Sequence, residues 1–261
     1  MDLAGVPVLV TGASSGIGRA LAEALAGRGA RLAIAARRGG LLEEVADGIG
    51  SRGAARPVVI EADLSRAGAA DELAAAAVAG LGRVEILVNN AGAGLVAAQA
   101  AMGDDEGARA LFETNLWSPL ALTRRLLPEL RASGGTVVNV TSSLQSVPIP
   151  LLGYYGASKA ALAHLTRTLR HELEGSGVSV LEIVPGATET AARDVGLLPW
   201  RGRPMRTPPP VSPGSAAEAI VKAIERGRRR GVHPATSLLP LELPVIGRLV
   251  ARIVTPRIDL G

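Results

Sequence analysis

The chain has 261 residues, enough for one large α/β domain whose core needs no disulfide or metal to hold it together. It contains no Cys, which excludes disulfide scaffolds and Cys-ligated zinc. The formal net charge is +4 and only 2% of the residues are aromatic, so we expect no nucleic-acid partner, because single-strand binders combine a basic groove with stacking aromatics.

The N-terminus leads directly into an apolar strand pattern, without the basic and apolar regions of a signal peptide. No stretch approaches the roughly 18 uninterrupted apolar residues of a membrane span. We therefore expect a cytoplasmic protein.

Short apolar runs alternate with longer amphipathic patterns along the chain, which is typical of βαβ units. Strands are expected at Val6–Val10, Arg31–Ala36, Arg56–Glu61, Val84–Asn89, Thr136–Thr141 and Val178–Val184, with a weaker seventh near Val232. Helices are expected at about 16–28, 66–81, 105–131, 153–174 and 213–228. The strand runs lack strict alternation, as in strands covered on both faces. The sequence thus predicts a doubly wound, mostly parallel Rossmann sheet of six to seven strands with helices on both faces, within residues 1–238.

Two segments near the C-terminus do not fit the βαβ pattern. Residues 199–214 are too rich in Pro for a core element, so a loop or flap is expected there. Residues 239–261 form a short amphipathic basic extension of the same domain. This extension could pack on its own domain or on a partner subunit, close over an apolar substrate site, or make weak contact with a membrane surface.

A glycine-rich segment, TGASSGIG, connects the first strand to the first helix. Glycines at this turn let the backbone approach a pyrophosphate, and the following helix N-terminus offers free N–H groups to phosphates. The residues expected to bind a dinucleotide here are Gly12, Ser14, Ser15, Gly16, Ile17 and Gly18.

The spacing T-G-x-x-x-G-I-G resembles that of the short-chain dehydrogenase/reductase family. Further motifs agree in order over roughly residues 5–235: an acid and Leu after the third strand, N-N-A-G after the fourth, and P-G-x-x-x-T after the sixth. The resemblance implies that these motifs complete the cofactor site, through Asp63, Leu64, Asn89, Ala91, Gly92, Pro185, Gly186, Thr188 and Thr190.

The end of the second strand indicates which nicotinamide cofactor is bound. NAD binders place an acid there to hold the ribose 2′-hydroxyl, but this position is Ala36. Arg37 follows at once, and its guanidinium suits a 2′-phosphate through charge-assisted hydrogen bonds; Arg38, the next residue, is expected to join the cofactor site. The sequence therefore predicts NADP(H) in preference to NAD(H).

Tyr155 and Lys159 lie four residues apart in a helical pattern, so both side chains share one helix face. A nearby ammonium favours the phenolate and is expected to lower the pKa of Tyr155 towards the working pH. In the resembled family this Tyr exchanges a proton with the substrate oxygen, and the Lys also holds the nicotinamide ribose.

The resemblance implies two more catalytic residues, Ser142 and Asn115. Ser142 lies 13 positions before Tyr155 and matches the family's layout better than Ser143, and it would donate a hydrogen bond to the substrate carbonyl. Asn115 would hold a water that relays protons to the Lys. Gln145 and Ser146 depart from the family, since many members have Gly in this loop beside the substrate.

The expected activity is therefore NADP(H)-dependent interconversion of an apolar ketone or aldehyde with its alcohol. A non-catalytic cofactor-binding regulator and a peripheral-membrane reductase of lipid-like substrates remain alternatives. The three His residues are scattered and no carboxylate cluster appears, so no metal site is expected. The family commonly forms dimers or tetramers through long helices on the flank of the sheet, which implies a homo-oligomer.

Overall fold

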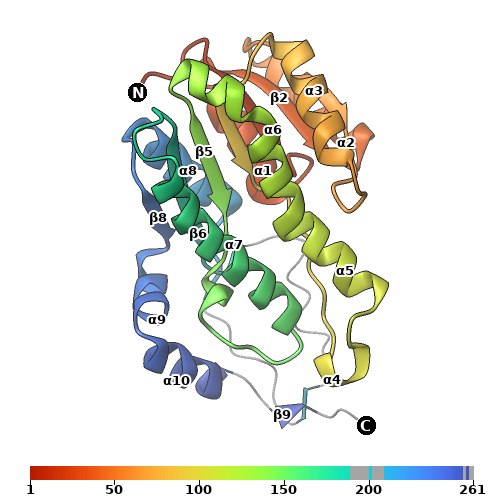
Figure 1. The fold of residues 1–261 in the computed structure, drawn as a ribbon, viewed down its shortest axis with the longest axis vertical. Helices are drawn as coiled ribbons and strands as arrows, with labels where there is room; N and C mark the ends of the chain where they lie inside the picture. Colours follow the sequence, from red (N-terminus) through yellow and green to blue (C-terminus); the bar gives the residue numbers. More distant parts are fainter. Residues whose placement is uncertain (189–199, 202–208, 255–256, 259–261) are drawn as a thin grey trace.

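A computed structural model of the chain describes residues 1–188, 200–201, 209–254 and 257–258. Its sheet has seven parallel strands in the order β3-β2-β1-β4-β5-β6-β8 (Figure 1). The strands are β1 (Pro7–Thr11), β2 (Arg31–Ala36), β3 (Val58–Glu61), β4 (Ile86–Asn89), β5 (Thr136–Val140), β6 (Ser179–Pro185) and β8 (Arg230–His233). Two short strands, β7 (Trp200–Arg201) and β9 (Arg257–Ile258), pair antiparallel away from this sheet. The predicted fold class is confirmed.

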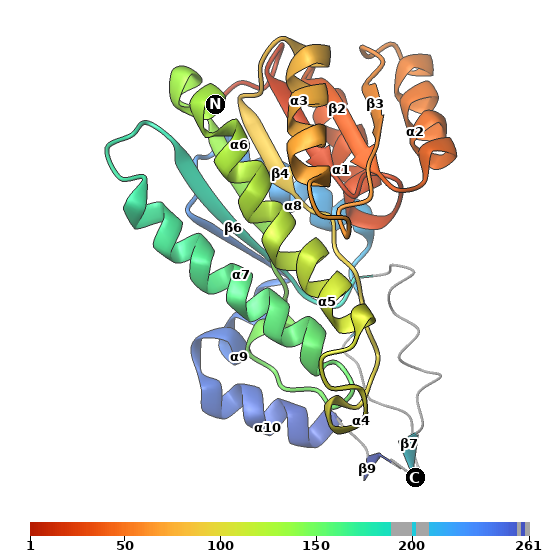
Figure 2. The ribbon, with the colours of Figure 1, turned by 45° about the vertical axis from the view of Figure 1, so that its right-hand side comes forward.

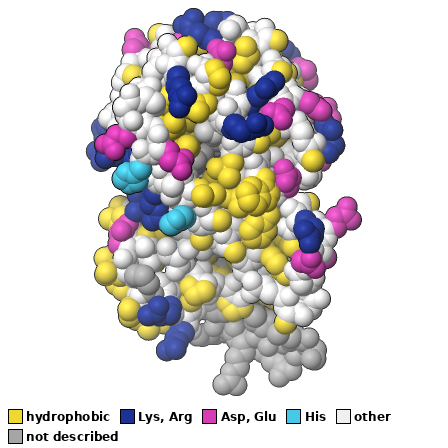
Figure 3. Space-filling view, viewed as in Figure 1, with side chains coloured by type: hydrophobic (Ala, Val, Ile, Leu, Met, Phe, Trp, Pro, Cys, Tyr) yellow, Lys and Arg dark blue, Asp and Glu magenta, His cyan; other side chains and the backbone are white. Residues whose placement is uncertain are grey.

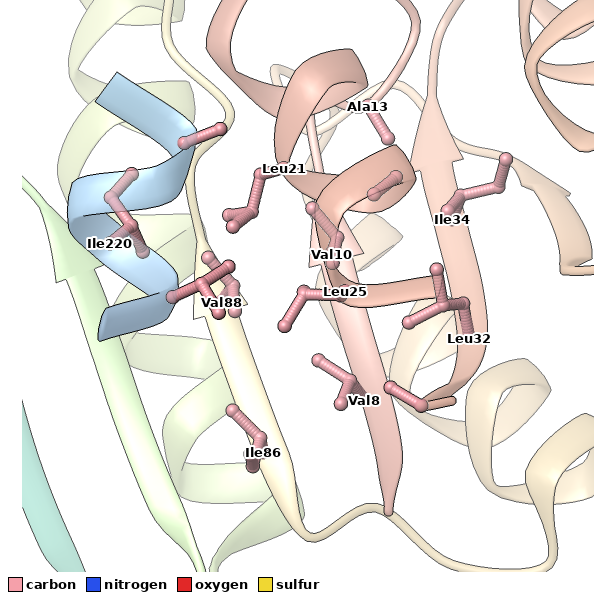
Figure 4. Close-up of a cluster of buried hydrophobic side chains, with 14 of the residues drawn as sticks. Val8, Val10, Ala13, Leu21, Leu25, Leu32, Ile34, Ile86, Val88 and Ile220 are labelled. Atoms are coloured by element: carbon pink, nitrogen blue, oxygen red, sulfur yellow. The ribbon is translucent and has the colours of Figure 1, made fainter. Parts of the chain in front are cut away.

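Helices cover both faces of the sheet (Figure 2). The main ones are α1 (Gly16–Ala26), α2 (Gly39–Ser51), α3 (Ala69–Leu81), α6 (Ser118–Ser133), α7 (Gly153–Glu172) and α8 (Pro213–Glu225). One core cluster lies between the sheet and α1, α2 and α8, and Figure 4 shows its β1, β2 and β4 side chains meeting those of α1 and α8. A second cluster lies between the opposite face and α3, α6 and part of α7. Strands buried on both faces explain the apolar runs without alternation.

Helix α2 was not among the expected segments. Its sequence, GGLLEEVADGIGS, contains four glycines, which lower the intrinsic helix propensity by about 1 kcal/mol each. Tertiary packing overrides that preference, because the buried residues Leu42, Val45, Ala46 and Ile49 follow helical spacing and join the first core cluster.

The expected helix 105–131 is interrupted. The chain forms α5 (Glu106–Phe112), then one π turn, η1 (Glu113–Trp117), and then α6. A π turn inserts an extra residue and turns the side chains that follow, and such turns occur frequently at functional sites. Asn115 lies inside this turn.

The remaining short elements surround the carboxyl ends of the strands and the C-terminus. They are α4 (Gln99–Met102), the 3₁₀ turns η2 (Ser143–Gln145) and η4 (Ala235–Ser237), α9 (Leu238–Glu242) and α10 (Pro244–Val254). The inner face of α10 packs through Val250 and Ala251 onto Val147 and Ile149, in the loop between η2 and α7. The extension therefore packs on the chain's own domain. Across the described ranges, no helix is long and apolar enough to cross a membrane.

Candidate active site

The glycine-rich turn between β1 and α1 is held in a shape that only glycine permits. Gly12 has a positive φ of 69°, and a Cβ there would lie 2.7 Å from Cα of Ala91. A Cβ on Gly18 would lie 2.2 Å from the carbonyl oxygen of Gly12. Partly buried Ile17, on the first turn of α1, packs against the core. These close approaches bring the N-terminus of α1 next to the ends of β1 and β4, where a pyrophosphate can meet its N–H groups.

Asn90, which was not predicted to be a site residue, ties this turn to the end of β4. Its Nδ2 donates to the carbonyl oxygen of Thr11 at 2.9 Å. The backbone N–H groups of Asn90 and Ala91 both donate to Thr11 Oγ1 at 3.0 Å. The N-N-A-G motif could have identified Asn90, since its two Asn residues lie on opposite sides of the backbone.

The side chain of Asn89, by contrast, is buried in the core, so only its backbone can contact a ligand. It is 2% exposed, and its Nδ2 donates to Asn139 Oδ1 at 2.8 Å. Asn139 Nδ2 in turn donates to Thr166 Oγ1 at 2.9 Å, which links β4, β5 and α7. Successive side chains of a strand point to opposite faces of the sheet. Asn89 therefore points towards α6, where it contacts Thr123, while Asn90 reaches the glycine-rich turn.

The two arginines after β2 take different positions. Arg38 donates from one terminal nitrogen to Ser15 Oγ at 2.8 Å and to Ser14 Oγ at 3.2 Å, so its guanidinium lies over the glycine-rich turn. Arg37 lies near enough to Asp63 to help lower the pKa of that carboxyl group. Both arginines are exposed. Sequence reasoning gave Arg37 the leading role, whereas Arg38 makes the contacts with the serines.

Asp63 and Leu64 lie just beyond β3. Hydrogen bonds from the side chain and the backbone N–H of Ser65 hold the pKa of Asp63 below its ordinary value. The carbonyl oxygen of Leu64 accepts a 2.7 Å hydrogen bond from Ser118 at the start of α6. The carboxylate is thus ionised and oriented before any ligand arrives.

Ser142 and Tyr155 meet at the carboxyl end of β5. Ser142 is buried and precedes η2, and its Oγ accepts from the N–H of Leu144 at 3.2 Å. The Ser142 hydroxyl also lies close enough to the phenol of Tyr155, at the start of α7, to lower the pKa of that phenol. A carbonyl oxygen placed between the two hydroxyls would receive hydrogen bonds from both.

The pKa of Tyr155 differs from the sequence expectation. Burial raises it above its ordinary value, and the nearby Ser142 hydroxyl only partly opposes this shift. Lys159 does not lower it, because Nζ of Lys159 donates instead to the carbonyl oxygen of Val140 at 3.0 Å. The phenol is therefore protonated at neutral pH in the structure without cofactor or substrate.

Lys159 is itself strongly perturbed. Its side chain is only 3% exposed, and burial lowers its pKa to about 8. A Cβ added to Gly92 would lie 3.5 Å from Lys159 Nζ and 3.6 Å from Asn115 Oδ1, so Gly92 leaves space between the two polar groups. The amine of Lys159 thus lies between Val140, at the end of β5, and Gly92 of the N-N-A-G segment.

Asn115 is fully buried and makes three hydrogen bonds. Its Oδ1 accepts from the N–H of Ala93 at 2.7 Å, and its Nδ2 donates to the carbonyl oxygen of Ala93 at 2.9 Å and to Ser158 Oγ at 3.0 Å. The π turn η1 gives Asn115 this inward direction. In this structure its amide anchors the N-N-A-G segment to α7; the predicted water relay remains a prediction.

The segment after β6 closes the opposite side of the site. The N–H of Gly186, next to buried Pro185, donates to the carbonyl oxygen of His233 at 2.7 Å. A Cβ on Gly186 would lie 2.6 Å from Ser237 Oγ, so the approach of the two segments requires glycine. Thr188 is buried and its Oγ1 donates to the carbonyl oxygen of Gly186 at 3.2 Å. Thr190 lies outside the described residues.

Together these segments put the predicted residues at the carboxyl edge of the parallel strands, where ligands of open α/β sheets bind. Among the residues that the structure describes, no group of three or more His, Asp or Glu could hold a metal ion. The donors in this region are backbone N–H groups, hydroxyls and cations, which suit an anionic dinucleotide.

Comparisons with known proteins agree with this geometry. The family model for short chain dehydrogenases matches residues 7–195. An 11-beta-hydroxysteroid dehydrogenase A of Sesamum indicum is 37% identical over 243 residues, which are 90% of this chain and 70% of that protein. The 11-beta-hydroxysteroid dehydrogenase 1A of Arabidopsis thaliana is 39% identical over 189 residues; these cover 72% of this chain but only 54% of that protein.

Solved structures show the same similarity. A short chain dehydrogenase/reductase from Burkholderia phymatum in complex with NAD has a TM-score of 0.80 at 26% identity, covering 100% of this chain and 99% of that one. A short chain dehydrogenase from Burkholderia cenocepacia in complex with NADP has a TM-score of 0.79 at 30% identity, covering 98% and 100%. Similar folds thus bind either cofactor. The chain belongs to the short-chain dehydrogenase/reductase family and has the oxidoreductase architecture of that family.

Proposed function

We propose that the protein is an NADP(H)-dependent reductase of apolar ketones or aldehydes, which also runs in the direction of alcohol oxidation. The observation that carries this proposal is that Ser142, Tyr155 and buried Lys159 gather at the same edge of the sheet as the glycine-rich turn, with Lys159 next to Gly92 of the N-N-A-G segment. A bound nicotinamide supplies or accepts the hydride.

The side chains then handle the proton and the charge. Ser142 donates a hydrogen bond to the substrate oxygen and stabilises the negative charge that develops on it. Tyr155, which carries its phenolic proton at neutral pH, gives that proton to the same oxygen. Lys159 lies where it can hold the cofactor's ribose, as the family resemblance implies.

The proposal is tested by NADPH oxidation against a panel of apolar ketones and aldehydes, with Tyr155→Phe as the test variant. Tyr154→Phe is the matched control, because Tyr154 is the only other tyrosine and its hydroxyl contacts the backbone of Gly103. We expect Tyr155→Phe to lose at least a thousandfold in kcat and Tyr154→Phe to stay within a few-fold of wild type. Wild-type turnover by Tyr155→Phe would refute the mechanism. Tight NADPH binding without turnover by the wild type would favour the non-catalytic alternative.

The preference for NADP(H) rests on Ala36, which has no acid to hold a ribose 2′-hydroxyl, and on Arg38. The guanidinium of Arg38 already bridges Ser14 and Ser15, and this group of one cation and two hydroxyls has the chemistry that a 2′-phosphate needs. A charge-assisted hydrogen bond contributes about 1.5–3 kcal/mol, which is roughly ten- to a hundredfold in affinity. We expect Arg38→Ala to raise the Kd of NADPH by that factor and to leave the Kd of NADH unchanged. Arg37→Ala removes the same positive charge as Arg38→Ala. Comparing the two variants shows which arginine contributes more to NADPH affinity. An equal loss for both cofactors would contradict the assignment.

The substrate that we propose is a large apolar carbonyl or secondary alcohol, such as a hydroxysteroid. Val96, which follows the N-N-A-G segment, is 43% exposed and offers an apolar surface at this edge of the sheet. The two relatives from Sesamum indicum and Arabidopsis thaliana described above carry the name 11-beta-hydroxysteroid dehydrogenase, which supports this class. A panel that compares steroid ketones with small charged ketoacids tests it, and a preference for the ketoacids would refute it.

A second proposal concerns the outer face of α10. Val245, Leu249 and Ile253 form one row at i, i+4 and i+8, and they are 67%, 55% and 56% exposed. Arg248 and Arg252 are exposed beside this row, and the helix contains no acid. Figure 3 shows hydrophobic and cationic side chains together at the lower left of the molecule, where α9 and α10 lie. We propose weak contact with an anionic lipid surface, which would suit a lipid-like substrate.

Co-sedimentation with vesicles tests this contact. Wild type is expected to bind vesicles containing phosphatidylserine more than vesicles of phosphatidylcholine alone, and Leu249→Gln with Ile253→Gln should abolish binding. Equal binding of wild type and variant would refute the proposal, as would a dimer that dissociates in the variant.

We also propose a homo-oligomer that forms through the flank of α6 and α7. Hydrophobic surface gathers in the middle of the face that carries these helices (Figure 3), and Trp117, at the junction of η1 and α6, is 54% exposed. Light scattering should report a dimer or tetramer, and Trp117→Arg should shift it towards monomer. A monomeric wild type would refute this proposal.

A further inference from the structure

Glu182 is a fully buried acid in the middle of β6, a strand that is otherwise apolar apart from its first residue. A buried carboxylate is stable only with close partners, because losing its hydration costs several kcal/mol. The partners of Glu182 come from the loop after β5 and from β8, and none of them is among the predicted site residues.

One carboxylate oxygen of Glu182 faces the loop after β5. Its Oε1 accepts a hydrogen bond from Gln145 Nε2 at 3.2 Å and a longer one from Thr141 Oγ1 at 3.5 Å. The other oxygen, Oε2, lies 3.4 Å from Nε of Arg230 on β8. Arg230 also pairs with Glu242 at the end of α9. The cation balances the buried charge, and the carboxylate is left to hold Gln145.

Gln145 is the last residue of η2, the short turn that begins beside Ser142. Its backbone N–H donates to the carbonyl oxygen of Ser142 at 3.1 Å, and the N–H of Leu144 donates to Ser142 Oγ at 3.2 Å. The carbonyl oxygen of Leu144 packs against Gly156, one residue after Tyr155, where a Cβ would lie 3.0 Å away. The turn is thus fixed between Glu182 on one side and the start of α7 on the other.

We propose that Glu182 is a positioning residue for the active site, which acts through Gln145 to fix the turn that carries Ser142. Hydroxyl groups that stabilise a developing charge must be held close to their productive geometry, and a short loop turn cannot supply that rigidity alone. A carboxylate anchored in the sheet gives the turn a rigid attachment. This inference builds on the proposed oxidoreductase function, because it concerns the same Ser142.

The test variant is Gln145→Met, which removes the amide but keeps the length of the side chain and leaves Arg230 to pair with Glu182. We expect kcat to fall at least tenfold, with KM for the ketone and Kd for NADPH within twofold of wild type. Glu182→Met, which removes the acceptor of the same hydrogen bond and leaves Arg230 paired with Glu242, should give a similar fall in kcat. Because both act through one hydrogen bond, the double variant should lose no more than the larger single variant.

Glu218→Met is the matched control, since it also removes a carboxylate paired with an arginine, Arg28, but far from the site. It should leave kcat unchanged. Amide hydrogen exchange provides a measurement that needs no substrate: Gln145→Met should speed exchange at residues 143–146 and leave β5 and β6 protected. Unchanged kcat and unchanged exchange in Gln145→Met would overturn the proposal, as would multiplicative losses in the double variant. If the wild type reduces no ketone, the proposed function fails, and the exchange measurement still decides whether Glu182 positions the turn.

Discussion

Replacing Lys159 should have opposite effects on the two properties of the enzyme: turnover should be lost, while the free energy of unfolding should rise. Burial lowers its pKa from 10.5 to about 8, and one pKa unit corresponds to about 1.4 kcal/mol, so charging this amine in the folded protein costs about 3 kcal/mol. Replacing it by Met removes that cost. The carbonyl oxygen of Val140 then loses its donor, which costs about 1 kcal/mol. We therefore expect Lys159→Met to abolish turnover and to raise the free energy of unfolding by about 2 kcal/mol at pH 7.

The pH dependence of this gain follows from the direction of the shift. The folded-state pKa lies below the unfolded one, so the unfolded chain binds more protons between about pH 8 and pH 10.5, and wild-type stability rises across that window. Below pH 8 the cost is fully present. By pH 9.5 only about 1 kcal/mol of it remains, so the advantage of Lys159→Met should nearly vanish.

Urea unfolding at pH 7 and pH 9.5 measures both quantities. Lys222→Met is the control, because Lys222 is the only other lysine and is exposed on α8. It should change stability by less than about 0.5 kcal/mol at either pH. A Lys159→Met protein no more stable than wild type at pH 7, or equally stabilised at both pH values, would refute the reasoning.

Three further outcomes are expected. Gly18→Ala should weaken NADPH binding more than tenfold in a fluorescence titration, because the added Cβ would lie 2.2 Å from the backbone oxygen of Gly12; normal affinity would contradict that close approach. Asn115→Leu should lower the free energy of unfolding by about 3 kcal/mol, since both backbone groups of Ala93 lose buried partners, and an unchanged urea midpoint would argue against the anchoring role. Ser142→Ala should lower kcat about a hundredfold with an unchanged Kd for NADPH, and a loss confined to Kd would move Ser142 out of the chemical step.

The layered fold and the approximate place of the site could both be predicted from the amino-acid sequence. Buried parallel strands need apolar residues throughout and crossover helices need a 3.6-residue period, so both patterns can be read locally. The expected strands agree with the seven-stranded sheet, including the weak seventh near Val232. The TGASSGIG turn could also be read from sequence, because contacts such as that between Gly18 and Gly12 leave no room for a side chain.

The tertiary structure alone decided features that depend on contacts distant in sequence. The four glycines of α2 lower its helix propensity, so the sequence predicts no helix there. The helix forms because its apolar face packs on the core. The π turn around Asn115 depends on Ala93 and Ser158, which lie 22 and 43 positions away. The assignment of the serine contacts to Arg38 required the placement of β2 beside β1.

Contacts distant in sequence also set the chemical environment of Lys159 and Glu182, so their roles could not be predicted from the sequence pattern. Spacing placed Lys159 four residues after Tyr155, but only the fold showed that its amine donates to Val140 and that burial, not a neighbouring ammonium, dominates the pKa of the phenol. In the sequence, Glu182 is simply the one charged residue of an apolar strand. Its link to Ser142 runs through Gln145, 37 positions earlier, and a contact across that distance is fixed only when β5, β6 and β8 come together in one sheet.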